Sequence, residues 1–233
     1  PSVMLNTYKD LASLIQQTDE PTLFIGFAEA ATALGQGVFE QYNSNNSFYI
    51  HSTRFQKSNK LLFSFKEEHS HAPHHLFYEP IDNDLKIILN NITRIILVDD
   101  EASTGNTANN LVNELKNIFP KVNNYLLLTI LDWSTKKYDN FEIKSLVKSN
   151  YKFESNNIKL ETNIVSEPLE VNNLNEIIPF NFGRYGTGKL NLNFDKLIDL
   201  NHFIDKKILV LGSAEFMYPP YLLAKYLEDN KVD

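Results

Sequence analysis

Residues 95–107 constrain the fold more than any other part of the sequence. They read Ile-Ile-Leu-Val-Asp-Asp-Glu-Ala-Ser-Thr-Gly-Asn-Thr, so four apolar residues precede two adjacent acids, Asp99 and Asp100, and a short loop. A continuous apolar run of this kind is typical of a strand buried on both faces, as in parallel sheets. In open α/β sheets, ligands bind just beyond the carboxyl ends of the strands. The segment therefore predicts a strand that ends at a binding site.

The loop after this strand has the chemistry of a phosphate site. A loop that enters a helix N-terminus directs backbone N–H groups outward, and the helix dipole favours anions there. Ser103, Thr104 and Thr107 add hydroxyl donors, and Gly105 lets the backbone approach a phosphate closely. The two acids, placed one turn away, can hold sugar hydroxyls and help retain a divalent cation. The predicted ligand is a sugar phosphate with a vicinal diol; the alternative is an ordinary capped turn between strand and helix.

The same alternation of apolar runs and amphipathic stretches extends over most of the chain. Strands are expected over residues 22–28, 47–51, 94–99 and 124–131, and helices over 32–42, 84–91 and 107–119. Continuous β-rich runs that alternate with helices predict an α/β fold in which a parallel sheet is covered on both faces.

Other regions depart from this alternation. Residues 54–80 are polar, rich in His and aromatic residues, and contain an alternating run at 61–65, so we expect an inserted hairpin or flap over about 55–80. Residues 151–160 have the Asn-rich turn chemistry of a second hairpin. A strand over 208–211 and a helix over 220–228 then start a new α/β unit. We expect a main domain over 1–165 and a small, incomplete C-terminal extension over 166–233.

Composition excludes several classes of protein. The chain has 22 basic and 29 acidic residues, which argues against nucleic acid as a partner because such proteins usually carry a strongly basic face. It has no Cys, which excludes disulfides, Cys-ligated zinc and thiol catalysis. No apolar run approaches the roughly 20 residues that span a bilayer, and no secretory signal is visible. We therefore expect a cytoplasmic protein with no membrane partner.

Residues 95–107 resemble the phosphoribosyl pyrophosphate (PRPP) motif of type I phosphoribosyltransferases. That motif has four hydrophobic residues, two acids, two variable positions, two hydroxylic or small residues, Gly, one variable position and Thr, and every constrained position is filled here. The resemblance implies a Rossmann-like fold with an inserted hood, in which residues 1–165 form the phosphoribosyltransferase domain. It also implies that Asp99 and Asp100 contact the ribose 2′- and 3′-hydroxyls. The 5′-phosphate would be wrapped by Ala102, Ser103, Thr104, Gly105, Asn106 and Thr107.

The resemblance implies that two further segments contact the diphosphate of PRPP. Residues 26–35 form a small-residue turn into a helix, where the pyrophosphate loop of the type I fold lies, so Ala28, Glu29 and Ala30 inherit that role. Glu29 would reach a magnesium ion or the acceptor. Arg54, after the second strand, could clamp pyrophosphate bidentately. The alternatives are a plain helix N-terminus and a surface Arg.

The sequence also contains a His-rich segment and a run that is similar to a P-loop. Residues 69–75 hold four His, and we expect a flap in which His69, His71 and His74 supply protonatable donors; a metal site and a solvated loop are the alternatives. Residues 183–189 have P-loop spacing through Lys189, but the next residue is Leu rather than Ser or Thr, which argues against an ATPase. Arg184 and Lys189 can still reach an anionic ligand.

Four blocks, residues 26–35, 52–54, 67–72 and 212–219, together resemble one subfamily. It is the orotate-phosphoribosyltransferase-like group encoded beside bacterial tellurium-resistance and stress genes. Its members carry a C-terminal extension named for a Thr-Arg-Ser-Pro tetrapeptide, which this sequence lacks, so the extension looks partial here.

The resemblance implies magnesium-dependent transfer of ribose 5-phosphate from PRPP to a base-like acceptor, with release of pyrophosphate, or the reverse reaction. The implied catalytic residues are Asp99, Asp100, Arg54 and Glu29, and Mg²⁺ would be held by the two Asp side chains largely through the substrate. A homodimer is a candidate assembly. Two alternatives stay open: a non-catalytic PRPP-binding sensor, and a metal-dependent hydrolase built on the His residues.

Overall fold

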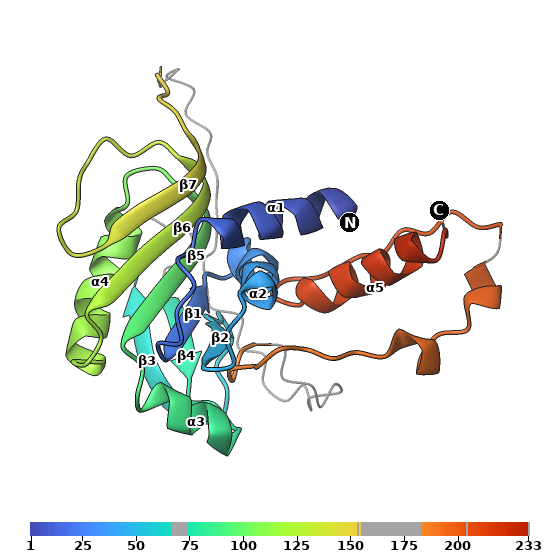
Figure 1. The fold of residues 1–233 in the computed structure, drawn as a ribbon, viewed down its shortest axis with the longest axis horizontal. Helices are drawn as coiled ribbons and strands as arrows, with labels where there is room; N and C mark the ends of the chain where they lie inside the picture. The colour runs from blue at the N-terminus through green and yellow to red at the C-terminus, as the bar shows by residue number, and fades with distance from the viewer. Residues whose placement is uncertain (67–73, 153, 155–182, 204, 233) are drawn as a thin grey trace, which may run out of the picture.

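One parallel sheet forms the centre of the protein (Figure 1). The computed structural model describes residues 1–66, 74–152, 154, 183–203 and 205–232. The sheet has the order β2-β1-β5-β6-β7, and every neighbouring pair of strands is parallel. The strands are β1 (Thr22–Gly26), β2 (Ser47–His51), β5 (Arg94–Ala102), β6 (Asn124–Asp132) and β7 (Glu142–Lys148).

Helices cover both faces of the sheet, so the predicted α/β fold is confirmed. One face packs against α1 (Ser2–Ser13) and α2 (Ala31–Gln41), and α5 (Tyr218–Asp229) packs in turn against these two helices. The other packs against α3 (Asn83–Leu89), α4 (Asn106–Ile118) and a hairpin of β3 (Leu61–Lys66) and β4 (His74–Tyr78). Alternation along β1 explains the two cores, because Phe24 joins the first and Ile25 the second.

The strand order places a topological switch between β1 and β5. From β1 the chain crosses through α2 to β2 on one side, whereas β5 lies on the other side and continues outward to β6 and β7. In doubly wound sheets, the crevice at such a switch, at the carboxyl ends of the strands, is where ligands bind. The carboxyl ends of β1 and β5 are Gly26 and Ala102.

The predicted hairpin within 55–80 is confirmed by the antiparallel pairing of β3 with β4. Its turn, including His69 and His71, lies outside the described residues. The hairpin packs its aromatic face onto the sheet, where Phe63 stacks on Phe77 with ring centroids 4.3 Å apart. An antiparallel bridge between Thr53 and Leu76 joins β4 to the residues that follow β2.

The C-terminal part differs from the prediction. The expected strand over 208–211 is wrong: these residues are irregular, and Leu209 and Leu211 are exposed. A strand needs a neighbouring backbone to pair with, which an apolar run alone does not supply. The expected helix is present as α5, which returns along α2 after two short 3₁₀ turns, η1 (Phe194–Lys196) and η2 (Leu200–Phe203) (Figure 1).

Residues 183–190 lie along the outer edge of the sheet. Tyr49 in β2 exchanges two backbone hydrogen bonds with Thr187, at 2.9 and 2.8 Å, and His51 N–H donates to the Gly183 carbonyl at 3.0 Å. The C-terminal part therefore pairs with the strand that borders the sheet. The hairpin expected over 151–160 falls almost entirely outside the described residues. Within the described part of the chain, no helix is both long and apolar enough to cross a membrane.

Candidate functional site

Three segments meet at the carboxyl edge of the sheet, and each follows a strand of the β2-β1-β5 group. The segments after β1 and β2 are joined directly. Ser52 N–H donates to the Gly26 carbonyl at 3.1 Å, and the Ser52 hydroxyl accepts the Ala28 N–H at 2.8 Å. Arg54 Nη2 donates to the Ala28 carbonyl at 3.2 Å. The structure therefore brings the two predicted diphosphate segments together beside the switch point.

The two acids of β5 lie at this edge, but the strand is longer than predicted. It continues through Ala102, a residue expected in the loop; the Ala102 carbonyl accepts the Trp133 N–H at 2.9 Å, next to β6. Asp99 and Asp100 are thus consecutive strand residues, and strand alternation directs them to opposite faces. Asp99 is half-buried and its Oδ1 accepts the Asp100 N–H at 3.0 Å, whereas the Asp100 side chain is exposed.

The loop between β5 and α4 presents unused N–H groups. Among the described residues, the backbone N–H groups of Ser103, Thr104 and Gly105 donate to no backbone carbonyl or side chain. Gly105 has φ +78°, in the left-handed region that favours glycine, and directly precedes α4. Three consecutive donors at the start of a 13-residue helix have the geometry that binds an anion.

Sequence reasoning missed the residues that hold this loop in place. Tyr138, from the β6–β7 connection, donates its hydroxyl to the Thr104 carbonyl at 2.8 Å and lies 2.9 Å from Asn106 Oδ1. Lys136 Nζ donates to the same Asn106 oxygen at 3.1 Å. Burial raises the pKa of the Tyr138 hydroxyl, so it stays a donor. The run Lys-Lys-Tyr after an apolar strand was the available signal.

The segment after β1 is short and leads into α2. Ala28 is buried, whereas Glu29 and Ala30 are exposed. The Glu29 carbonyl accepts both the Thr32 N–H at 3.3 Å and the Thr32 hydroxyl at 3.0 Å, which fixes the first turn of α2. The Glu29 carboxylate accordingly faces solvent at the same edge as Asp100.

Arg54 is tied into the site rather than extended on the surface. Its Nη2 contacts the segment after β1, as described above, and its Nη1 donates to the His74 carbonyl of β4 at 2.9 Å. His74, the first residue of β4, has an exposed side chain, whereas its neighbour His75 is buried and its Nδ1 lies 2.8 Å from the Ser52 hydroxyl. Within the described ranges, no three His, Cys, Asp or Glu side chains form a group that could hold a metal ion.

The P-loop-like run after residue 182 has another role. Lys189 donates to the Phe39 carbonyl and, at 2.5 Å, to the Tyr42 carbonyl, both at the end of α2. Since α2 runs antiparallel to the strands, this ammonium group lies at the amino edge of the sheet, away from the site. Arg184 instead pairs with Glu215 at 2.8 Å, at the carboxyl end of β2.

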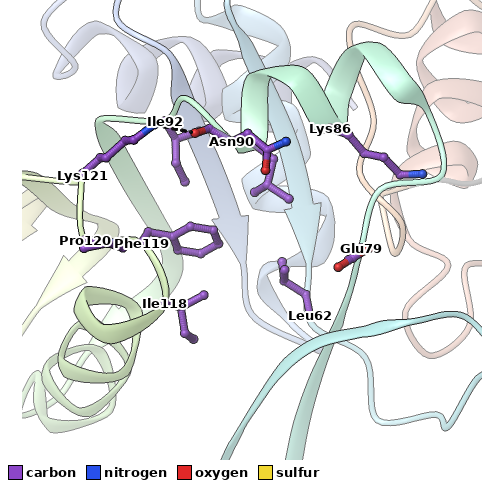
Figure 2. A pocket seen from close by; sticks show the side chains of 10 residues that line it. Leu62, Glu79, Lys86, Asn90, Ile92, Ile118, Phe119, Pro120 and Lys121 are labelled. Atoms are coloured by element: carbon purple, nitrogen blue, oxygen red, sulfur yellow. Dashed lines mark hydrogen bonds between the residues drawn. The ribbon is translucent and has the colours of Figure 1, made fainter.

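A cavity of about 370 Å³ lies elsewhere (Figure 2). It is formed where α3 and α4 end, which is the amino edge of the sheet, and its lining combines apolar side chains with Glu79, Asn90 and two lysines. It contains none of the predicted site residues. Its lining is Leu62, Glu79, Lys86, Leu89, Asn90, Ile92, Ile118, Phe119, Pro120 and Lys121.

Fold and site together define a doubly wound α/β protein with a loop that enters a helix N-terminus at its topological switch point. The model of the phosphoribosyl transferase family matches residues 1–155, and the chain belongs to that family. It is therefore an enzyme of the glycosyltransferase class.

Solved phosphoribosyltransferase structures are similar at low sequence identity. A hypoxanthine phosphoribosyltransferase from Staphylococcus aureus is 12% identical, with a TM-score of 0.37 over 61% of this chain and 73% of that one. An adenine phosphoribosyltransferase from Rhodothermus marinus is 10% identical, with a TM-score of 0.43 over 64% and 81%. The Trypanosoma brucei adenine enzyme, in complex with AMP, pyrophosphate and ribose-5-phosphate, is 16% identical, with a TM-score of 0.39 over 63% of each chain. A comparison with curated proteins gives no significant match.

Proposed function

We propose that this phosphoribosyltransferase transfers ribose 5-phosphate from PRPP to a base-like acceptor, with release of pyrophosphate, or catalyses the reverse reaction. One observation carries the proposal: three consecutive N–H groups of the loop after β5 have no acceptor in the described part of the chain, and this loop follows two carboxylates at the switch point. A phosphate with a nearby diol is the ligand whose groups complement that arrangement.

Each part of PRPP has a proposed partner. The 5′-phosphate binds the loop from Ala102 to Thr107, where the N–H groups and hydroxyls donate. The ribose hydroxyls donate to Asp99 and Asp100, which would approach the ribose from the two faces at the end of β5. The diphosphate lies against the segment after β1, which comprises Ala28, Glu29 and Ala30, and against Arg54, whose guanidinium already borders that segment.

Magnesium fits this donor set. Mg²⁺ commonly binds one or two carboxylates together with substrate phosphates and waters, rather than a cage made only by protein. Asp99 and Asp100 would hold the ion largely through the bound substrate, and Glu29 is a further exposed carboxylate at the same edge. The ion would supply positive charge that offsets the charge of the diphosphate.

The chain's own contribution to the reaction is electrostatic. Departure of pyrophosphate leaves positive charge on the ribose and places negative charge on the diphosphate. The carboxylates hold the ribose in position and lie near its developing positive charge, while the Arg54 guanidinium donates to the leaving group. The β3–β4 hairpin packs beside Arg54 through the His74 carbonyl, and a cover at this point would exclude water from the reacting centre.

The proposal extends to the subfamily and the setting. The blocks at residues 26–35, 52–54, 67–72 and 212–219 support the orotate-like group found beside tellurium-resistance and stress genes. On that assignment we propose a cytoplasmic enzyme, with a homodimer as the assembly to test.

Isothermal titration calorimetry with PRPP and MgCl₂ tests this function. We expect saturable binding that weakens when Mg²⁺ is omitted. The double variant Asp99→Asn, Asp100→Asn should bind PRPP at least about tenfold more weakly, since it loses charge-assisted hydrogen bonds worth roughly 1.5–3 kcal/mol each.

The matched control is Glu101→Gln, an exposed acid of the same strand that should leave the affinity unchanged. Pyrophosphate release on addition of candidate bases identifies the acceptor. Unchanged affinity in the double variant, or a wild-type chain that does not bind PRPP, would contradict the proposal.

A further inference from the structure

A carboxylate from the C-terminal part of the chain is buried at the end of β2. Glu215 is 6% exposed, and both of its oxygens accept hydrogen bonds. Oε1 accepts the Arg54 N–H at 2.6 Å, and Oε2 accepts the Thr53 hydroxyl at 2.6 Å and Arg184 Nη2 at 2.8 Å. Burying a charge is costly unless it is paired and hydrogen-bonded, so these three donors make the position tenable.

The turn that carries Glu215 is held by its own hydrogen bond and by the helix that follows it. Phe216 N–H donates to the Ser213 carbonyl at 2.9 Å, and Ala214 adopts φ +49° within this turn. The following helix α5 is anchored at Tyr218, which is buried and packs near Tyr8 of α1. The backbone thus holds Glu215 toward the end of β2.

The contacts of Glu215 lead directly to the proposed diphosphate segments. It accepts the N–H of Arg54, the same residue whose guanidinium donates to the Ala28 carbonyl. Thr53, its second partner, is also bridged to Leu76 of the hairpin. One carboxylate therefore fixes the point where the segment after β2, the hairpin and the C-terminal turn meet.

Arg184 adds a second guanidinium at this point. Its side chain is 26% exposed, and its charged end lies over the Phe55 ring at 5.9 Å. A guanidinium has five N–H donors, and Glu215 receives one of them. Among the described residues, the buried Arg184 Nε has no hydrogen-bond acceptor. Glu215 therefore contacts the Arg184 guanidinium directly and Arg54 through its backbone N–H, which places the two arginines side by side.

We infer that the C-terminal part of the chain completes the diphosphate end of the site: Arg184 binds the diphosphate beside Arg54, and Glu215 is a positioning residue that holds both. The inference rests on the proposed function and adds two residues that lie beyond the part of the chain matched by the family model. A planar guanidinium suits a diphosphate because it can donate to two phosphate oxygens at once.

Two ligands that differ in the diphosphate test this inference. Calorimetry of the full chain with MgCl₂ compares PRPP with ribose 5-phosphate, which lacks the diphosphate. Arg184→Gln should weaken PRPP binding about tenfold and change ribose 5-phosphate binding less than about twofold. The control Lys207→Gln removes the same charge at an exposed position of the same segment and should change neither affinity.

Glu215→Gln tests the positioning role. The amide keeps the shape of the side chain but has one acceptor oxygen, so it cannot accept from all three donors. We expect the same selective loss of PRPP affinity as for Arg184→Gln. A purely structural role would weaken both ligands alike, and that result, or unchanged affinities, would overturn the inference alone. A wild-type chain that binds neither ligand would overturn the proposed function and this inference with it.

Discussion

The hydroxyl group of Ser52 lies 2.8 Å from Nδ1 of His75, and so joins the end of β2 to the β3–β4 hairpin. The same hydroxyl accepts the Ala28 N–H at 2.8 Å. His75 is buried, with its ring edge-on to Phe27. A single buried oxygen thus connects the hairpin with the segment proposed to contact the diphosphate.

Ser52→Ala should therefore affect both stability and ligand binding. The buried Ala28 N–H loses its acceptor, which costs roughly 1–3 kcal/mol in free energy of unfolding. The segment after β1 also loses a fixed contact, so we expect PRPP affinity to fall severalfold. Urea denaturation and titration calorimetry measure the two effects.

Ser47→Ala is the matched control for this variant. Ser47 is buried at the other end of β2, where its hydroxyl donates to the Ser44 carbonyl at 3.0 Å. Its loss should lower stability without changing PRPP affinity. If both variants lower the affinity equally, the hydroxyl of Ser52 has no special connection to the site.

Gly105→Ala should weaken phosphate binding. The φ of +78° is strained for a residue with a side chain, and the added Cβ would lie 2.8 Å from Tyr138 Cε2. Such a conformation costs on the order of 1–3 kcal/mol, and relief by movement would displace the loop that follows β5. We expect at least tenfold weaker binding of ribose 5-phosphate. Gly188→Ala is the control, because none of the described residues comes within 4 Å of its added Cβ and the variant should bind normally.

Local sequence patterns predicted much of the fold. The strands β1, β2, β5 and β6 are continuous apolar runs, and each was expected within a few residues of its observed bounds. The strand β7 was not expected, because it lies at the edge of the sheet and its Glu, Lys and Ser residues interrupt any apolar run. The run at 208–211 was read as a strand because local composition says nothing about a pairing partner.

The candidate site likewise has a part that the local sequence predicts and a part that only the fold brings together. The acids and the loop after β5 are adjacent in sequence, so a motif could indicate them. Tyr138 reaches Thr104 across 34 residues, and Glu215 reaches Thr53 across 162. Contacts over such separations depend on how the sheet and the C-terminal part pack, and no spacing rule in a single sequence reports that.

Lys189→Met should destabilise the protein without affecting the site. Its ammonium group donates to the Phe39 and Tyr42 carbonyls at the end of α2, where the helix no longer supplies the usual i+4 N–H donors. We expect a loss of about 1–2 kcal/mol in urea denaturation. PRPP affinity should not change, since these carbonyls are at the amino edge of the sheet. A tenfold affinity loss, with exposed Lys207→Met unchanged, would show that Lys189 serves the ligand after all.

Asp132 should make stability depend on acid pH. It ends β6 and is 2% exposed, and it accepts hydrogen bonds from Lys148 Nζ at 2.8 Å, Ser134 N–H at 2.8 Å and Ser134 Oγ at 2.5 Å. Burial alone would raise the pKa of this carboxyl, but the bonds to Lys148 and Ser134 outweigh it, so the pKa is lowered.

A carboxyl whose pKa is lower in the folded state than in the unfolded state stabilises the protein above the unfolded pKa, about 3.9, and that contribution is lost as pH falls through the folded pKa. Asp132→Asn should lower the free energy of unfolding by roughly 1–3 kcal/mol at pH 7, and the difference from wild type should shrink below pH 4. Urea denaturation at a series of pH values measures it. The exposed Asp139→Asn is the control, with a small effect at every pH. A difference for Asp132→Asn that stays constant down to pH 2 would contradict the role of the charge, because a neutral carboxyl would then contribute equally.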